Sequence, residues 1–231
     1  VELDGSNMVR IIPDEDVDDV RPSGKSAAKA FIPSIPPTLD DALTWFVLAT
    51  AARRARGDEG HATMLIHTSV KTDIHDQFRG PLGAFVSGLA RKWETGDSAT
   101  VERLASQWDK ETALVTAGTF GLVPLVFDDL SPFVGDVLGR CRVVIDNFRS
   151  DDRLDYSEDG QVAIAVGGNT LSRGLTLEGL TVSYFVRAAG AYDTLLQMAR
   201  WFGFRFGYED LPRIWMTEEL RQWFRHLATV E

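Results

Sequence analysis

Five short runs rich in β-branched and apolar residues constrain the fold of this 231-residue chain more than any other feature. They lie at about residues 63–67, 142–146, 162–167, 181–186 and 212–216. Runs of this length, separated by segments in which apolar residues recur at helical spacing, are typical of buried strands in a parallel sheet. The sequence therefore predicts an α/β fold with a mainly parallel sheet flanked by helices.

A long segment with helical character separates the first two of these runs. Residues 74–93 and 98–117 space their apolar side chains as helices do. Residues 118–140 are apolar but are interrupted by Gly and Pro, which favours a broken helix. We therefore expect a mostly helical insertion at about residues 76–138, between two strands of the sheet.

End signals predict three helices outside this insertion. They span residues 38–57, 193–205 and 217–228, with Thr38, Asp193 and Thr217 as the respective N-terminal caps. Side-chain oxygens at such positions accept hydrogen bonds from the free N–H groups of the first turn. Residues 1–37 hold an acidic stretch followed by Pro, Ser and Gly, which predicts a lead-in or linker with at most one short strand near Met8–Ile12. Residues 38–231 are expected to form one domain.

Composition excludes several classes of protein. With 44% hydrophobic and 25% charged residues the chain is able to bury a core, and it has no apolar run long enough to span a bilayer. The net charge of −10 argues against nonspecific binding to nucleic acid, because attraction to phosphate favours a basic face. The single Cys141 cannot form an intrachain disulfide, so a reducing, cytoplasmic location is expected. Because the chain starts at Val1 rather than Met, we expect it to be part of a longer protein.

Several motifs that would carry chemistry are incomplete. Residues 23–26 (Ser-Gly-Lys-Ser) resemble the end of a phosphate-binding loop, but Asp19 stands where that loop needs Gly. No Gly-x-Gly and no Gly-x-Ser-x-Gly occurs, so the fingerprints of dinucleotide binding and of the Ser hydrolases are missing. His67, Asp73, His75 and Asp76 lie close in sequence, but their spacing matches no helical pair of metal ligands. We interpret these four residues as structural.

A polar, Gly-containing loop follows the third predicted strand. Residues 167–176 contain small residues, three hydroxyls, an amide and Arg173. Loops at the carboxyl ends of parallel strands are where α/β proteins place ligands, and this set of groups suits a phosphate or a phosphodiester backbone. An ordinary turn from strand to helix is the alternative interpretation.

The helix predicted at residues 193–205 carries a second polar pair. Gln197 and Arg200 are three residues apart, so they share one face of that helix. The aromatic residues around them are expected to pack in the core or at an interface. An Arg held by such packing could be directed at a phosphate across a cleft, although stacking on an aromatic ring is a sufficient structural reason for it.

Four stretches of the chain resemble the Z1 domain family, whose members are named as endonucleases. They are Ala62–Ser69, Ala163–Arg187, Asp193–Arg205 and the pair Gly207-Tyr208. The most specific part is the string Ser-Arg-Gly-Leu-Thr-Leu-Glu-Gly-Leu-Thr at residues 172–181. This family in turn resembles the second RecA-like domain of superfamily-two helicases and translocases. The resemblance therefore implies a RecA-like parallel sheet with a helical insertion.

The resemblance also implies roles for individual residues. Those expected to contact a nucleic-acid backbone are His67, Thr68, Ser69, Thr170, Ser172 and Arg173. Those expected to bind nucleotide are Gly174, Thr176 and Gln197. The expected catalytic residue is an arginine finger, and the choice between Arg200 and Arg205 stays open.

The implied function is that of the second RecA-like domain of an ATP-dependent, DNA-acting helicase or translocase, in restriction or defence. ATP and Mg²⁺ are the implied cofactors, bound mainly by a first RecA-like domain that is expected N-terminal to this chain in the full-length protein. DNA is the implied partner, and the 231 residues alone are expected to be inactive. Two alternatives stay open, namely a metal-dependent endonuclease and a non-catalytic, helicase-like module that binds DNA.

The lysines of the chain allow a test of the endonuclease alternative. A restriction-type nuclease core uses an acidic residue two places before a Lys to hold a metal ion and activate water. The residues at that spacing before the five lysines are Ser23, Ala27, Ser69, Ala90 and Trp108. That core is therefore excluded unless its Lys is replaced, and no metal ligands are expected in this chain.

Overall fold

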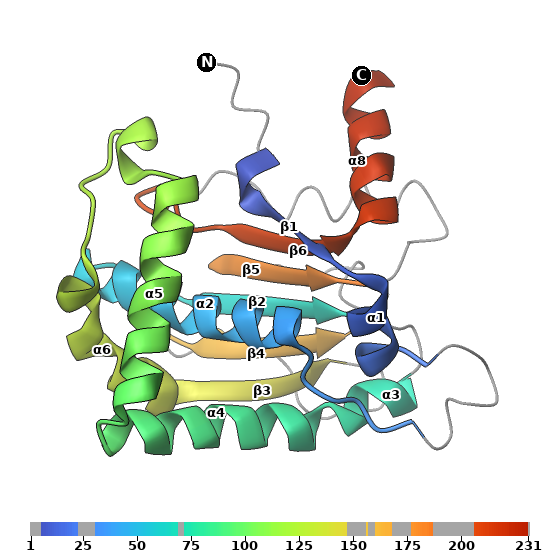
Figure 1. The fold of residues 1–231 in the computed structure, drawn as a ribbon, viewed down its shortest axis with the longest axis horizontal. Coiled ribbons are helices and arrows are strands. Elements are labelled where there is room, and N and C mark those ends of the chain that lie inside the picture. Colours follow the sequence, from blue (N-terminus) through green and yellow to red (C-terminus); the bar gives the residue numbers. More distant parts are fainter. Residues whose placement is uncertain are drawn as a thin grey trace.

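The computed structural model describes residues 6–22, 31–68, 72–146, 156, 160–167, 177–186 and 206–230. Within these ranges a six-stranded sheet has the order β1-β6-β5-β2-β4-β3, and each neighbouring pair of strands is parallel (Figure 1). The strands are β1 (Val9–Ile12), β2 (Ala62–His67), β3 (Cys141–Asp146), β4 (Val162–Gly167), β5 (Leu180–Phe185) and β6 (Arg213–Thr217). The five predicted strands are all present, so the prediction of an α/β fold with a parallel sheet is confirmed.

The helical insertion between β2 and β3 is also confirmed. It consists of α3 (Thr72–Gln77), α4 (Arg79–Glu94), α5 (Ser98–Leu114), the 3-10 helix η3 (Ala117–Phe120) and α6 (Phe127–Arg140). Figure 1 shows α4, α5 and α6 together with α2 (Pro37–Ala55) on one face of the sheet. Among the described residues, no helix is long and apolar enough to cross a membrane.

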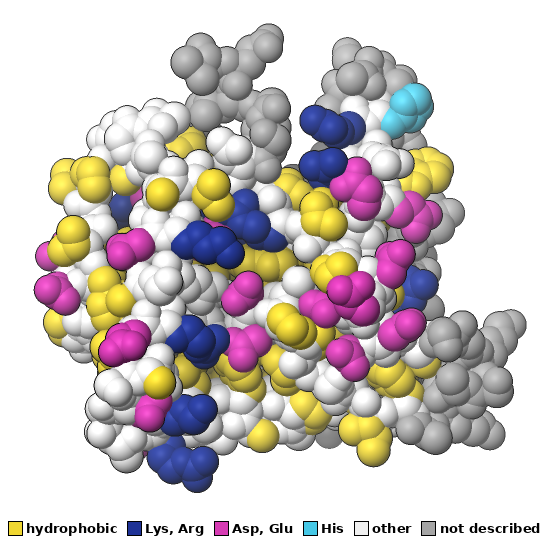
Figure 2. Space-filling view, viewed as in Figure 1, with side chains coloured by type: hydrophobic (Ala, Val, Ile, Leu, Met, Phe, Trp, Pro, Cys, Tyr) yellow, Lys and Arg dark blue, Asp and Glu magenta, His cyan; other side chains and the backbone are white. Residues whose placement is uncertain are grey.

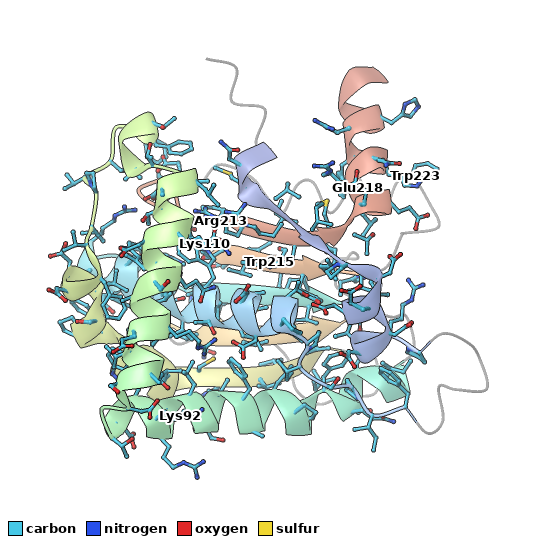
Figure 3. All side chains as sticks on the ribbon, viewed as in Figure 1. Lys92, Lys110, Arg213, Trp215, Glu218 and Trp223 are labelled. Atoms are coloured by element: carbon cyan, nitrogen blue, oxygen red, sulfur yellow. The ribbon has the colours of Figure 1, made fainter. Side chains whose placement is uncertain are left out.

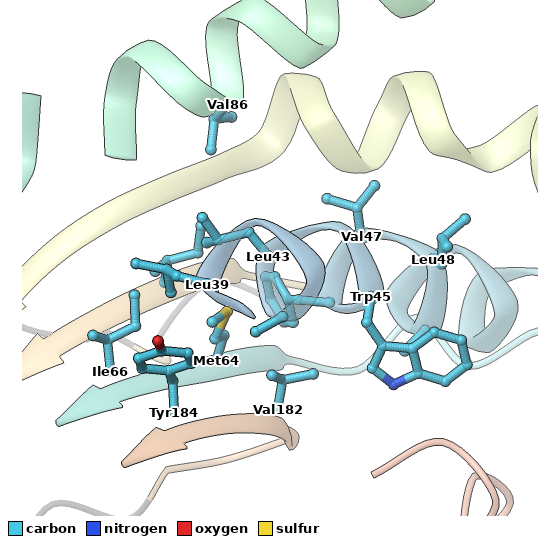
Figure 4. Packing of buried hydrophobic residues seen from close by; sticks show 14 of the residues in the cluster. Leu39, Leu43, Trp45, Val47, Leu48, Met64, Ile66, Val86, Val182 and Tyr184 are labelled. Carbon is cyan, nitrogen blue, oxygen red and sulfur yellow. The ribbon is translucent and has the colours of Figure 1, made fainter. Parts of the chain in front are cut away.

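Helix α2 is the centre of the core on that face. Its inner side chains, including Leu39 and Leu43, lie over Met64, Ile66 and Tyr184 of the sheet (Figure 4). Its outer side is covered by α5 and α6, so almost the whole helix is buried. Burying each large apolar side chain contributes about 1.5–3 kcal/mol, which makes this helix the main source of packing energy between sheet and insertion.

Alternate side chains along each central strand enter two different clusters. On β2, Met64 and Ile66 pack with α2, whereas Leu65 belongs to the cluster on the opposite face of the sheet. On β5, Tyr184 belongs to the cluster with α2 and Phe185 to the cluster on the opposite face. Because both faces are buried, these strands are apolar along their whole length rather than at every second residue.

A buried ionic cluster fastens the insertion to the edge of the sheet. Glu111 of α5 accepts a hydrogen bond from Arg213 Nε at the start of β6 (2.8 Å) and one from Arg10 Nε of β1 (2.9 Å). Arg213, labelled in Figure 3, is 1% exposed and lies over the ring of Trp45, 4.7 Å from its centroid. Burial raises the pKa of Glu111, but the hydrogen bonds from the two arginines outweigh burial and hold it below its ordinary value. Burial lowers the pKa of Arg213 to about 10.

The terminal segments complete the sheet and its carboxyl edge. The short strand expected near Met8–Ile12 is present as β1, preceded by the 3-10 helix η1 (Ser6–Met8) and followed by α1 (Asp14–Val20). At the other end, α8 (Glu218–Val230) follows β6 directly. Thr217 accepts a hydrogen bond from the backbone N–H of Leu220 (3.4 Å), so its predicted capping role is confirmed.

Candidate functional site

Strand β2 lies where the order of the sheet reverses. Its neighbours are β4 on one side and β5 on the other, and β3 and β6 lie beyond them. In open α/β sheets, ligands bind outside the carboxyl ends of the strands at such a switch point. The candidate residues that follow β2 and β4 therefore belong to the edge at which a ligand is expected.

The strands that precede the two candidate loops are adjacent and in register. Ile66 of β2 pairs with Val166 of β4, and β2 ends at His67 as β4 ends at Gly167. The two strand ends that precede the candidate loops therefore lie side by side at the same edge of the sheet.

His67 is held inside the carboxyl edge. Its side chain is 1% exposed, and its ring meets the ring of Phe185 in an edge-on arrangement with centroids 5.9 Å apart. Its backbone carbonyl accepts a hydrogen bond from the N–H of Val186 (3.1 Å), which extends the pairing between β2 and β5. The imidazole is therefore positioned by packing, beneath the edge rather than on an open surface.

Thr68 is the first residue after β2, and its side chain is fully buried. Its hydroxyl oxygen has no hydrogen-bond partner among the residues that the structure describes. A buried hydroxyl without a partner destabilises a protein by about 1–3 kcal/mol. The Thr68 hydroxyl therefore does not stabilise the fold through any described contact.

The other candidate residues lie outside the described residues. They are Ser69, Thr170, Ser172, Arg173, Gly174, Thr176, Gln197, Arg200 and Arg205. Of the six residues expected to contact nucleic acid, the structure therefore describes two, the consecutive residues His67 and Thr68.

A polar cluster that the sequence did not predict lies at the same edge. The hydroxyl of Tyr184 on β5 is 2.8 Å from that of Thr38, and Thr38 donates hydrogen bonds to Asp16 through its backbone N–H (3.0 Å) and its hydroxyl (2.6 Å). The prediction that Thr38 caps α2 is therefore wrong, since Pro36 is the N-cap residue and α2 begins at Pro37. Burial raises the pKa of the Tyr184 hydroxyl, which keeps it protonated as a donor or acceptor. No signal in the sequence could have found this cluster, because Asp16 differs from the exposed acidic residues around it only by its burial in the folded chain.

The last part of the family-like string has a structural role at the opposite, amino edge. Gly179 has φ +65°, and a Cβ atom there would lie 1.6 Å from the carbonyl oxygen of His61. The carbonyl of Gly179 accepts hydrogen bonds from the N–H of Thr63 (3.0 Å) and from Arg53 (3.3 Å). The hydroxyl of Thr63 donates to the carbonyl of Glu178 (2.7 Å). This turn therefore requires glycine and binds the start of β5 to the start of β2.

Gly207 and Tyr208, the last two residues of the family-like pattern, also lie against α2 near this edge. The guanidinium of Arg56 forms two hydrogen bonds with the carboxylate of Asp210, both 2.7 Å long, and one with the carbonyl of Gly207 (3.3 Å). The guanidinium of Arg53 lies over the ring of Tyr208, 4.1 Å from its centroid. These contacts anchor the segment that leads into β6.

The described residues contain no group of three His, Cys, Asp or Glu side chains that could hold a metal ion. Two of the residues considered for such a group, His67 and His75, are each 1% exposed.

The fold and its edge define a parallel α/β domain whose candidate residues follow adjacent strands at a topological switch point. Residues 38–231 match the family model described as the Z1 domain. Because this match covers most of the chain, the protein belongs to the Z1 domain family. Neither the curated proteins nor the solved structures compared with the chain include a match.

Proposed function

We propose that this chain is the second RecA-like domain of an ATP-dependent motor that acts on DNA. The observation that carries the proposal is the pairing of β2 with β4, which directs the two candidate loops from one edge at the switch point of a parallel sheet. Membership of the Z1 domain family supports it through the resemblance of its characteristic strings to helicase motifs.

In this proposal the carboxyl edge contacts the DNA backbone. His67 ends β2 and is followed by Thr68 and Ser69, and Thr170, Ser172 and Arg173 follow β4. Hydroxyls, an imidazole and a guanidinium are suited to phosphate and sugar, so the contacts position the DNA with little reading of its sequence. The buried, unpaired hydroxyl of Thr68 supports this role, because a ligand or a rearranged loop could supply the partner that the described residues lack.

Nucleotide chemistry is assigned to the interface with a first RecA-like domain. ATP and Mg²⁺ would be held mainly by that domain, because this chain has no phosphate-binding loop and its described carboxylates form no metal group. The contribution of this chain would be Gly174, Thr176 and Gln197 beside the nucleotide and an arginine finger that stabilises charge on the transferred phosphoryl group. Arg200 is favoured over Arg205 as the finger, because three residues separate it from Gln197 and the two share a helical face.

A steady-state ATPase assay on the full-length protein tests the motor. Arg200→Ala is expected to lower turnover by ~10³-fold or more while nucleotide binding changes far less, because the finger acts on the transition state. The isolated 231 residues are expected to show no hydrolysis above background. Wild-type turnover in both Arg200→Ala and Arg205→Ala would reject the motor, and so would robust hydrolysis by the isolated chain.

A salt titration of DNA binding tests the contact surface separately. Arg173→Gln in the full-length protein is expected to weaken binding to any duplex sequence and to reduce the salt dependence by about one unit of slope. Arg142→Gln is the matched control, because Arg142 is an exposed arginine at the amino end of β3. Equal losses in the two variants would reject the proposed surface. DNA binding without any ATPase activity in the full-length protein would favour the non-catalytic module instead.

A further inference from the structure

A pocket of about 330 Å³ opens at the carboxyl edge of the sheet on the side of β1, away from β2 and β4. Its walls come from the end of β1, from α1, from the residue after β5 and from the start of α8. None of these elements carries a residue that the proposed motor uses, so the pocket is a separate feature of the molecule.

The floor of this pocket is apolar and accessible to solvent. Ile11 is 40% exposed, and Pro13 and Val17 beside it are half-buried. Ile12 and Val186 close the base and are buried. A hollow with aliphatic walls favours an aliphatic group, since water is displaced from apolar surface when such a group binds.

The rim of the pocket is acidic. Asp14, Glu218 and Glu219 line it, and Glu15 and Asp18 extend the acidic surface along α1. Figure 2 shows acidic side chains gathered on the face over α1 and the start of α8. Neither Asp14 nor Glu219 forms an ion pair within the described part of the chain, whereas Glu218 accepts a hydrogen bond from Arg221 (2.9 Å).

The arginine that lines the rim already forms a hydrogen bond within the protein. Arg21 also lines the pocket, and its guanidinium donates a hydrogen bond to the backbone carbonyl of Val186 (3.3 Å). Among the described residues Arg221 also pairs with Glu218, which leaves Asp14 and Glu219 of the lining carboxylates without an ion pair. These two carboxylates favour a cationic ligand.

An exposed aromatic ring continues this surface along α8. Trp223, labelled in Figure 3, is 51% exposed. It lies four residues after Glu219, which places both on one face of the helix. A Trp face attracts guanidinium and ammonium groups, and this attraction adds to that of neighbouring carboxylates.

We propose that this pocket binds a cationic peptide segment of a partner protein, in which Arg or Lys residues alternate with aliphatic ones. The aliphatic side chain would occupy the hollow over Ile11 and Val17, and the cations would meet Asp14, Glu219 and the ring of Trp223. Charge complementarity selects this occupant, because an acidic peptide or a nucleic-acid backbone would be repelled by the same rim. The inference is independent of the proposed motor function.

Fluorescence anisotropy with the 231-residue chain tests this inference. The probe is a fluorescein-labelled peptide of alternating arginine and leucine, and the matched probe carries glutamate in place of arginine. The arginine peptide is expected to bind saturably and to weaken with added salt, as attraction between exposed charges does. The double variant Asp14→Asn, Glu219→Gln is expected to weaken its binding by about tenfold or more.

Two further variants separate this pocket from general charge attraction. Glu102→Gln removes an exposed carboxylate of α5 outside the pocket and is expected to leave the affinity unchanged. Ile11→Ser keeps every charge and is expected to weaken binding of the arginine peptide by several-fold, because the hollow loses apolar surface. Circular dichroism of each variant checks that the fold is retained. No saturable binding at millimolar peptide, equal binding of the glutamate peptide, or equal loss in Glu102→Gln would overturn the inference.

Discussion

The two edges of the sheet differ in the partners of their polar groups. At the amino edge, Arg53 and Arg56 bond to backbone carbonyls and carboxylates, and the turn at Gly179 brings its own carbonyl into the same network. At the carboxyl edge, Thr68 buries a hydroxyl that has no partner among the described residues, and Asp14 lines an open pocket without an ion pair there. The contacts at the amino edge therefore bind the turns to the starts of the strands, whereas the candidate residues follow the carboxyl ends, where parallel α/β sheets place ligands.

The largest loss of stability is expected for Gly179→Ala at the amino edge. The new Cβ would lie 1.6 Å from the carbonyl oxygen of His61, at a φ of +65°. The start of β5 must then move away from β2, and we expect a loss of roughly 4 kcal/mol or more in the free energy of unfolding. Urea denaturation followed by circular dichroism measures it.

A second glycine provides the control for this substitution. Gly57 has φ +81°, and a Cβ atom added there would meet no atom within 4 Å, so Gly57→Ala tests the backbone conformation without the collision. We expect it to cost about 1 kcal/mol. Equal losses in the two variants would show that the contact with His61 is unimportant.

The next largest effect is expected for Glu111→Gln, in the ionic cluster near the amino ends of the strands. The substitution leaves Arg10 and the fully buried Arg213 without their shared carboxylate. Breaking a buried ion pair by removing one partner destabilises a protein by about 3–5 kcal/mol, and we expect a loss in this range. Glu102→Gln on the same helix α5 removes an exposed carboxylate and should change stability by less than ~0.5 kcal/mol.

The same cluster predicts how stability depends on pH. Because the pKa of Glu111 is lower in the folded protein than in the unfolded chain, its ionised form stabilises the fold above its ordinary pKa. This contribution is lost as the pH falls below the ordinary range of a Glu and through the folded pKa. Denaturant midpoints measured from pH 6 downwards should therefore fall less steeply in Glu111→Gln than in the wild type. Parallel curves would contradict the assignment.

The smallest predicted effect compares the two ends of β2 directly. Thr63→Val removes a hydroxyl that donates to the carbonyl of Glu178 (2.7 Å), and we expect a loss of about 1–2 kcal/mol. Thr68→Val removes a hydroxyl without a described partner, so stability should stay within about 0.5 kcal/mol of the wild type or increase. Thermal melts of the two variants measure these changes in stability. A larger loss in Thr68→Val would show that the Thr68 hydroxyl does have a partner in the folded protein.

Periodicity was sufficient to predict much of the fold. The run at residues 162–167 could be recognised as a strand because a strand buried on both faces is apolar throughout. The acidic run of α1 could not be read in this way, because its pattern resembles a solvated linker until Asp16 and Val20 are seen to be buried. For the candidate site, strand ends predicted where His67 and Thr68 would lie, but not that their side chains would be enclosed.

Local spacing and short strings of residues were enough to establish the class of fold, the helical insertion and the family. Which strands are neighbours and which polar groups are paired depended on the folded chain as a whole. Glu111 accepts a hydrogen bond from Arg213, which is more than a hundred residues away along the chain. Asp14 lines the same pocket as Glu218 and Glu219. No local pattern in the sequence predicts either arrangement. Partners that are far apart along the chain are brought together by burial of the apolar faces between them, and that energy belongs to the whole core rather than to any local segment.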